Sequence, residues 1–327
     1  MAYSQEVIRR AKAKLASAKA DRESQYRERL QQAYVQLPRL KELDVLLRRS
    51  MVQAAQAVFT TGGDPVAAME QVKQENLALQ KERQALIDTQ LPKNFLDENP
   101  VCDRCGGSGY LGSTMCSCLS QLCLQEQLSE LSGLTQGYER FDNFRFDYYP
   151  ERPDPIYGVS PRMVMEKNFA KCQRFAETFP NGGNLLFVGA TGLGKTFLSG
   201  CIANAVARKG VSITYESAPR LFAKLEKSRF TPTEENRLEA EKFTSCDLLI
   251  IDDLGTEMPG SFVTAALYSL VNDRLLDGKN TIISTNLLIS EIAKRYNPQI
   301  ASRLEGNFDV LTFLGEDIRV LKNRGSK

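Results

Sequence analysis

The sequence of 327 residues contains no histidine. This absence excludes imidazole as a catalytic base and as a metal ligand, so any metal site must use other side chains. The chain has no apolar run long enough to span a membrane, and its first residues lack the basic stretch and apolar core of a secretory signal. We therefore expect a cytoplasmic protein without membrane association, in which disulfides are rare. A net charge of only +2 does not demand a nucleic-acid partner, although a local basic surface is compatible with it.

A complete phosphate-loop motif, G-x-x-x-x-G-K-[ST], lies between a short apolar strand at 184–188 and an expected helix. Its glycines let backbone N–H groups approach phosphate oxygens without Cβ clashes, and the helix N-terminus adds partial positive charge. Lys195 is expected to reach the outer phosphates, and Thr196 to ligate Mg²⁺. The expected nucleotide contacts are Gly189, Ala190, Thr191, Gly192, Leu193, Gly194, Lys195, Thr196 and the following Phe197.

A second apolar strand, expected at 247–252, ends in two adjacent carboxylates, which is the Walker B pattern. We expect Asp252 to hold Mg²⁺ through water and Asp253 to orient the attacking water. Many ATPases of this kind carry Glu at the second position, and Asp is one methylene shorter. The alternative is a buried strand that meets a turn at Asp-Asp. With the phosphate loop, the pair predicts a Mg²⁺-dependent ATPase.

Three further polar residues are candidates for contact with the nucleotide. Asn286 ends the strand expected at 280–285, where a sensor side chain reaches the γ-phosphate or the water. Arg303 has the setting of an arginine finger that acts across a subunit interface, because its planar guanidinium pairs with phosphate oxygens; a surface salt bridge is the alternative. Arg319 is a candidate second phosphate sensor. The finger predicts self-association through the ATPase domain.

Four cysteines within seventeen positions form a candidate metal centre. Cys102 and Cys105 make a C-x-x-C turn followed by glycines, and Cys116 and Cys118 follow as a second pair. This spacing predicts a structural Cys₄ zinc site. Cys123 is an alternative ligand, and a redox pair or an iron–sulfur cluster are the other interpretations.

The chain divides into four expected segments: helical partner-binding residues 1–92, a cysteine module at 99–125, a linker at 126–162 and an ATPase core at 163–327. The first fifty residues hold twelve Lys or Arg against six Asp or Glu, which indicates either solvated helix faces or a docking surface. In the core, strands expected at 184–188, 211–215, 247–252, 280–285 and 308–314 alternate with helices. That alternation predicts an α/β fold with a parallel sheet covered on both faces.

The order of phosphate loop, Asp-Asp-Leu-Gly, Ser-Thr-Asn and Ser-Arg-Leu resembles the AAA+ ATPases of the DnaC/DnaI type, over residues 138–322. These proteins load the bacterial replicative helicase, and the transposon-associated IstB ATPases are close relatives. The resemblance implies a P-loop AAA+ core without a helical lid, and a DnaB-type helicase and single-stranded DNA as partners. The cysteine module resembles the zinc element of DnaI-type loaders. Only their position suggests that the N-terminal helices bind the helicase.

The resemblance also implies a DNA-contacting element after the second strand. Lys224 and Lys227 can present charge to a phosphate backbone there, and Phe222 or Phe230 can stack a base. The alternative is an amphipathic helix with a solvated basic face. Three other functions compete with helicase loading: an IstB-like transposition helper, a scaffold that binds nucleotide without turnover, and a zinc-dependent DNA-binding protein in which ATP is structural.

Overall fold

The computed structural model describes residues 3–60, 65–132 and 138–324. The expected segments 1–92, 126–162 and 163–327 each include a few residues outside these ranges. By their contacts the residues form two compact units. The phosphate-loop unit comprises residues 1–11 and 120–327, and the helical unit comprises residues 12–119. This grouping differs from the expected division, because the cysteine module joins the helices and the segment expected as a linker joins the core.

The phosphate-loop unit is built on a five-stranded parallel sheet of order β4-β5-β6-β3-β7. The strands are β3 (Leu185–Val188), β4 (Ile213–Ser217), β5 (Leu248–Leu254), β6 (Asn280–Thr285) and β7 (Asp309–Thr312). All five expected strands are present within a few residues of their expected bounds, and the predicted parallel α/β core is confirmed.

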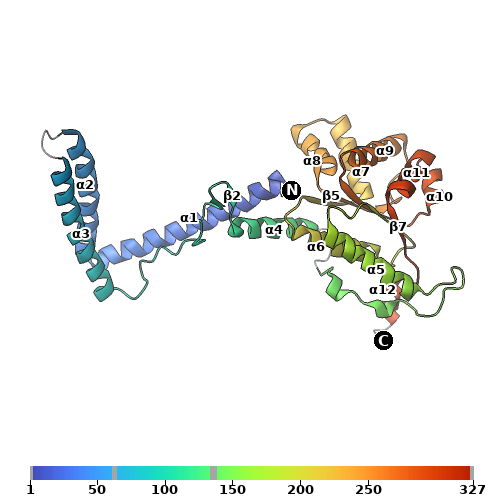
Figure 1. Cartoon of the computed structure of the whole chain (residues 1–327), viewed down its shortest axis with the longest axis horizontal. Helices are drawn as coiled ribbons and strands as arrows, with labels where there is room; N and C mark the ends of the chain where they lie inside the picture. Colours follow the sequence, from blue (N-terminus) through green and yellow to red (C-terminus); the bar gives the residue numbers. More distant parts are fainter. Residues whose placement is uncertain (1–2, 61–64, 133–137, 325–327) are drawn as a thin grey trace. The chain divides into compact units, whose positions relative to one another are not determined.

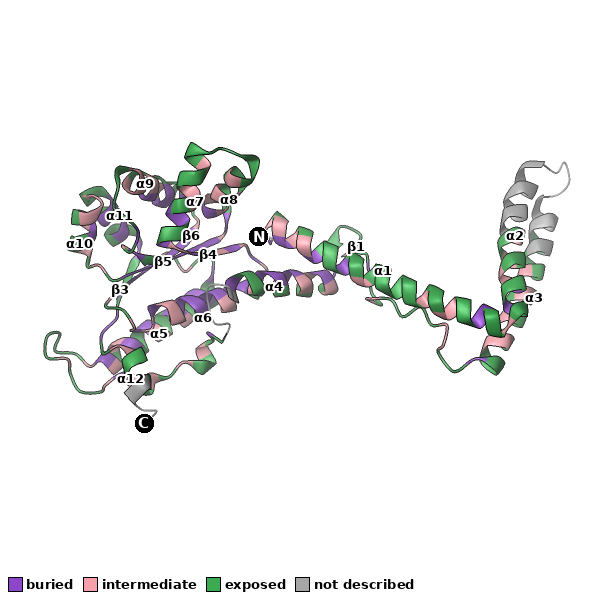
Figure 2. Ribbon diagram, turned by 180° about the vertical axis from the view of Figure 1, so that it is seen from behind, coloured by how far each residue is buried: buried purple, intermediate pink, exposed green. Residues whose placement is uncertain are grey.

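Helices cover both faces of this sheet, as Figure 1 shows. Side chains alternate along a strand, so Leu185 and Phe187 face the core formed with α5 and α6, whereas Leu186 and Val188 face α7 to α11. The inner strands β3, β5 and β6 are almost completely buried, which explains the apolar sequences of β3 and of the first part of β5 (Figure 2). The edge strand β7 is mostly exposed. The helices of this unit are α4 (Ser117–Ser132, from residue 120 on), α5 (Pro161–Thr178), α6 (Lys195–Ala207), α7 (Ala218–Phe230), α8 (Glu234–Ser245), α9 (Ser261–Leu276), α10 (Ile289–Arg295), α11 (Pro298–Asn307) and α12 (Ile318–Arg324), with short 3₁₀ turns η1 (Phe141–Asn143) and η2 (Phe146–Tyr148).

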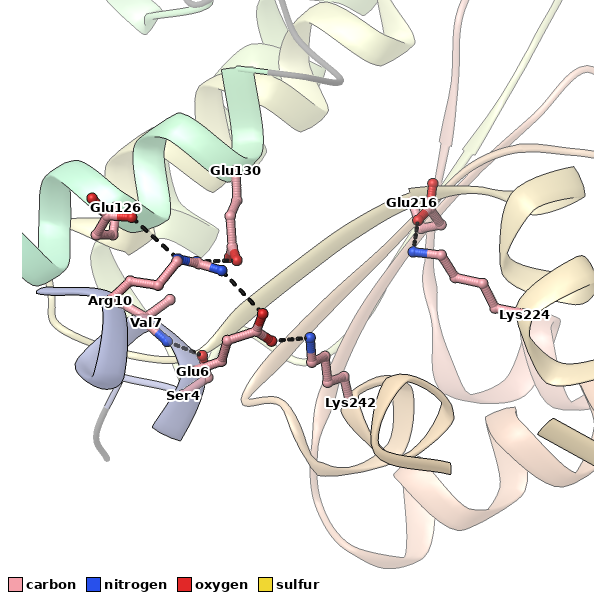
Figure 3. A network of polar contacts seen from close by, with 9 residues as sticks. All are labelled: Ser4, Glu6, Val7, Arg10, Glu126, Glu130, Glu216, Lys224 and Lys242. Carbon is pink, nitrogen blue, oxygen red and sulfur yellow. Dashed lines mark hydrogen bonds and ion pairs between the residues drawn. The ribbon is translucent and has the colours of Figure 1, made fainter. Parts of the chain in front are cut away.

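The first turns of α1 (Gln5–Gln36) pack on the phosphate-loop unit. Tyr3, Val7 and Ala11 recur at i, i+4 spacing and are buried there. On the polar side, Glu6 pairs with Lys242 of α8, and Arg10 pairs with Glu6 and with two glutamates of α4 (Figure 3). The start of the chain is therefore an integral part of this unit.

The helical unit contains the rest of α1, α2 (Pro38–Thr60), α3 (Pro65–Gln90) and a small hairpin, β1 (Tyr110–Leu111) with β2 (Thr114–Met115). Asp44 of α2 accepts a hydrogen bond from the Tyr34 hydroxyl at 2.6 Å. It also forms an ion pair with Arg83, whose Nε lies 2.6 Å from Asp44 Oδ1. This cluster joins α1, α2 and α3 by charge-assisted hydrogen bonds. Among the described residues, no helix is both long and apolar enough to cross a membrane.

Candidate nucleotide site and cysteine centre

The phosphate loop connects β3 to α6 and has the backbone that its glycines allow. Gly192 and Gly194 have φ of +78° and +90°, a region that strains other residues. A Cβ at Gly194 would lie 2.6 Å from the Tyr149 hydroxyl oxygen, and that hydroxyl donates to the Leu193 carbonyl at 2.9 Å. Any larger residue at Gly194 would therefore clash with Tyr149.

Lys195 lies at the start of α6, and its side chain is turned back onto its own loop. Its Nζ donates to the carbonyl oxygens of Gly189 and Ala190, each at 2.7 Å. Burial lowers the pKa of Lys195, while the nearby charges of Asp253 and Asp252 act in the opposite direction. Gly189 and Ala190 thus contact the lysine through their carbonyls, and the remaining residues of the motif line the cavity.

The two carboxylates at the end of β5 lie in different environments. Asp252 is buried, with Oδ2 accepting from the Tyr215 hydroxyl at 3.0 Å and Oδ1 accepting from the Ser284 hydroxyl. Asp253 has φ of +56° and lines the cavity instead. Partial burial, followed by repulsion from Asp252, raises the pKa of Asp253.

A cavity of about 800 Å³ lies at the carboxyl ends of the strands, where ligands bind in open parallel sheets. Residues of the phosphate loop, Asp253, Asn286 and Arg319 all line it. Sequence reasoning did not predict the other lining residues, which come from the segment between α4 and α5, expected as a linker, and from α12. This set, called the aromatic wall, comprises Tyr138, Glu139, Asn143, Phe144, Arg145, Tyr148, Tyr149, Ile318 and Lys322. Thr256 also lines the cavity.

This cavity fits a nucleotide by size and by chemistry. Its volume is within the range of small-molecule sites, and its lining includes the phosphate loop and four cationic side chains, Arg145, Lys195, Arg319 and Lys322. The lining also includes aromatic rings, among them Tyr138 and Phe144, which both lie close to Phe197. Thr196 and Asp253 line the cavity with oxygen atoms, the type of ligand that Mg²⁺ prefers, and Asp252 precedes Asp253 in the chain.

Arg303 lies on α11 and does not line this cavity. Its guanidinium donates to the Tyr268 hydroxyl at 2.7 Å and to Asn272 Oδ1 at 3.3 Å, and it lies 4.3 Å from the centre of the Tyr268 ring. Both partners belong to α9. The structure therefore separates Arg303 from the nucleotide site of its own chain.

Of the candidate DNA contacts on α7, Phe222 was wrongly predicted. Phe222 is 3% exposed and packs in the core against the sheet, so it cannot stack a base. Lys224 pairs with the buried carboxylate of Glu216 at 2.8 Å, so its charge is partly neutralised (Figure 3). Phe230 is 66% exposed. Its ring centre lies 5.8 Å from that of Phe262 at the start of α9.

The four cysteines of the module are brought together in the helical unit. Their sulfur atoms all lie within 4.8 Å of one another, with Cys102 and Cys116 at 3.8 Å and Cys105 and Cys118 at 3.5 Å. Four thiolates on a tetrahedral zinc ion at about 2.3 Å stand roughly 3.8 Å apart, so the arrangement fits. Although burial acts to raise it, hydrogen bonds led by the Gly109 N–H lower the pKa of Cys105 to about 6. The cluster can therefore hold a metal ion.

The other cysteines are outside this group. Cys123 is buried in α4 and belongs to the phosphate-loop unit, so the structure does not bring it into the cluster. Cys172, Cys201 and Cys246 are buried and form no disulfide.

Comparison with known proteins identifies an ATP-binding family for part of the chain. Residues 162–305 match the model of the IstB-like ATP binding protein family. An ATP-binding protein assigned to insertion sequence IS232 of Bacillus thuringiensis subsp. berliner is 28% identical over 144 residues, which are 42% of this chain and 56% of that protein. The replicative helicase loader DnaC of Buchnera aphidicola subsp. Acyrthosiphon pisum is 26% identical over 196 residues, 58% of this chain and 73% of that loader.

A crystal structure of the DnaC helicase loader is 21% identical, covers 53% of this chain and 98% of that chain, and superposes with a TM-score of 0.43. The chain spans little more than half the length of the IS232 relative. The matched residues 162–305 include the phosphate loop, both carboxylates, Asn286 and Arg303, so this part of the chain is similar to IstB-like and DnaC-like ATP-binding proteins.

Proposed function

We propose that the protein hydrolyses ATP with Mg²⁺ and uses this cycle to load a DnaB-type replicative helicase onto single-stranded DNA. The observation that carries the ATPase assignment is the cavity in which the phosphate loop meets Asp253, Asn286 and Arg319. These residues come from three neighbouring strands and the C-terminal helix, and their chemistry suits phosphoryl transfer to water.

Each residue of the site has a separate role in the proposed reaction. Lys195 and Arg319 bind the outer phosphates, and Thr196 with Asp252 holds Mg²⁺, the latter through water because both of its oxygens already accept hydrogen bonds. Asp253 orients the attacking water, and its raised pKa suits a group that must accept a proton. Asn286 hydrogen-bonds the γ-phosphate or the water. Bound Mg²⁺ supplies neutralisation of the phosphate charge.

For the nucleic-acid partner, the support lies at the end of α7. Arg229 lies 5.8 Å from the ring centres of both Phe230 and Phe262, and Lys227 is on the same helix. Aromatic rings beside cations suit single strands, whose bases stack while the phosphates pair. The test is anisotropy of labelled single-stranded and duplex DNA with Lys227→Ala and Phe230→Ala, and with the exposed Arg237→Ala as control. Equal affinities in all variants would contradict this surface.

We further propose that Arg303 acts as a finger in the nucleotide site of a second copy. Its absence from the lining of its own cavity and its position on α11 support this role. In a mixture, an Arg303→Ala subunit keeps an intact site and an Asp253→Asn subunit keeps an intact finger, so mixing should restore some active interfaces. Absence of rescue, with both variants assembling normally, would rule out action across an interface.

The loader assignment itself rests on the helical unit and its cysteine centre, which accompany the nucleotide core. We assign zinc to the four cysteines and helicase docking to the helices within residues 1–92. The match to DnaC covers more of this chain than the match to the IS232 protein, which also favours a loader. The test is co-purification of the replicative helicase with the tagged full-length protein from its native host.

The second candidate is a helper ATPase of transposition, because the matching family is IstB-like. Such a protein binds a transposase and duplex DNA. Capture of a transposase in place of the helicase, with tighter binding to duplex than to single-stranded DNA, would select this function over loading.

A further inference from the structure

The loop after β5 has two sides with different surroundings. Asp253 and Thr256 line the nucleotide cavity. Glu257, the next residue, is 5% exposed and lies on the buried side of the loop. Glu257 does not line the nucleotide cavity. A buried carboxylate costs folding free energy unless several hydrogen-bond or ion-pair partners compensate for its lost hydration.

Glu257 has such partners from two directions. Its Oε2 accepts the Gly255 N–H at 2.9 Å, and its Oε1 accepts the Tyr296 hydroxyl. Arg295 Nε lies 3.5 Å from the same Oε1, and Arg295 also donates to the Glu257 carbonyl oxygen. The carboxylate therefore bonds to its own loop on one side and to the end of α10 on the other.

Hydrogen bonds within the loop connect Glu257 to the residues that line the cavity. Thr256 donates to the Asp253 carbonyl from its N–H at 3.2 Å and from its hydroxyl at 2.8 Å, which closes a tight turn over 253–256. The Thr285 hydroxyl donates to the Leu254 carbonyl at 2.6 Å. Because the turn is this short, a shift of Glu257 must move Asp253 and Thr256.

The other end of the cluster is the corner between α10 and α11. Arg295 is the last residue of α10 and Tyr296 follows it. Asn297 then caps α11 by accepting the Ile300 N–H at 2.7 Å, and α11 carries Arg303. The cluster thus connects the turn of Asp253 to the helix of the proposed finger.

We propose that Glu257 is a positioning residue for ATP hydrolysis, which with Tyr296 and Arg295 fixes the 253–256 turn at the nucleotide cavity. This inference rests on the proposed ATPase function. We expect Glu257 to affect turnover rather than nucleotide affinity. The cluster of Glu257, Tyr296 and Arg295 positions Asp253, the carboxylate proposed to orient the water, and its hydrogen bonds and ion pairs among the described residues include neither the phosphate loop nor the aromatic wall.

The test measures steady-state ATP hydrolysis and nucleotide affinity in full-length variants, well below their melting temperatures. Tyr296→Phe removes one hydroxyl and should lower kcat at least about threefold, with KM and nucleotide Kd within about twofold. Glu257→Gln keeps one acceptor oxygen, for either the Gly255 N–H or the Tyr296 hydroxyl, and should retain more turnover than Glu257→Ala. The matched control is Tyr157→Phe, because Tyr157 is 54% exposed on the loop before α5.

Three results would overturn the proposal. Unchanged kcat in Tyr296→Phe and Glu257→Gln, with only a lower melting temperature, would make the cluster purely structural. A higher KM at unchanged kcat would assign it to nucleotide binding. If the parent protein hydrolyses ATP no faster than Lys195→Ala, the proposed ATPase function is wrong. If the parent protein is faster than Lys195→Ala but Tyr296→Phe has the kcat of the parent protein, only the positioning role of Glu257 is wrong.

Discussion

The Tyr215 hydroxyl on β4 donates to Asp252 Oδ2 on β5 at 3.0 Å. Ser284 on β6 donates to the other oxygen of the same carboxylate, so Asp252 is fixed from both neighbouring strands. Ser284 Oγ also accepts the Asp253 N–H at 2.9 Å. The buried aspartate is therefore held rigidly, while the second aspartate turns toward the nucleotide cavity. This difference supports the separate roles proposed for the two carboxylates, Asp252 in metal binding and Asp253 in water activation.

Tyr215→Phe should weaken this arrangement without altering the shape of the core. Loss of the donor leaves a buried carboxylate oxygen without a hydrogen bond from that side, which costs about 1–3 kcal/mol in free energy of unfolding. Urea unfolding measures that change, and titration of ATP binding with Mg²⁺ should show a weaker metal dependence. The control Tyr157→Phe should change the free energy of unfolding by less than about 0.5 kcal/mol. If Tyr215→Phe matches the control in both measurements, Tyr215 does not hold Asp252.

Asp253→Asn should stabilise the nucleotide-free protein at neutral pH. Because its pKa is raised, the folded state binds the proton of Asp253 more tightly than the unfolded state, so stability falls as pH rises through the folded pKa. The neutral amide avoids that loss, and Asn also tolerates the positive φ. The melting temperature should exceed that of the parent protein at pH 7.5, and the gain should shrink as pH falls toward about 4.

In the same variant, ATP should bind and persist, because Thr196 and Asp252 still hold Mg²⁺. Equilibrium binding of labelled ATP beside a turnover assay checks this. Loss of binding together with turnover would mean that the roles of the two carboxylates are reversed.

Arg274 is expected to be a principal source of stability in the phosphate-loop unit. It is 1% exposed, and its guanidinium donates to the carbonyls of Phe243, Cys246 and Asn280, among other acceptors. Arg274→Leu should lower the free energy of unfolding by about 2–4 kcal/mol, because several buried carbonyls lose their donors. Arg237→Leu, at a residue with exposed ion pairs on α8, should cost less than about 1 kcal/mol. Equal losses of unfolding free energy in Arg274→Leu and Arg237→Leu would contradict the stabilising role of the buried Arg274 donors.

Removal of the metal should act on the helical unit. The purified protein should carry about one zinc ion, and Cys102→Ser should release it and destabilise that unit, because metal binding contributes folding energy in small modules. Metal analysis and hydrogen exchange within residues 12–119 provide the measurements. Cys201→Ala, in the core of the other unit, should keep its zinc. Iron with visible absorption, or no metal in the parent protein, would refute the zinc assignment.

Local patterns in the sequence were enough to predict the sheet and one wall of the site. Strands β3 and β5 are largely apolar because they are buried on both faces, and the phosphate loop is a fixed motif, so both can be predicted from neighbouring residues. The aromatic wall was expected as a linker, since Tyr149 reaches Leu193 only through the tertiary fold. Phe222 was misassigned because helical spacing alone does not say which face of α7 meets the sheet. The partners of Asp252 and Glu257 come from other strands and helices, and no local pattern predicts them.

The most direct measurement is ATP turnover by the parent protein and by Lys195→Ala, with and without single-stranded DNA. Lys195 is the one cation of the phosphate loop, so its loss should abolish hydrolysis while the circular dichroism spectrum and the zinc content stay unchanged. We predict Mg²⁺-dependent turnover in the parent protein, raised by single-stranded DNA more than by duplex, and none above background in the variant. Equal turnover in both proteins, or turnover that requires no Mg²⁺, would contradict the nucleotide site on which the whole assignment rests.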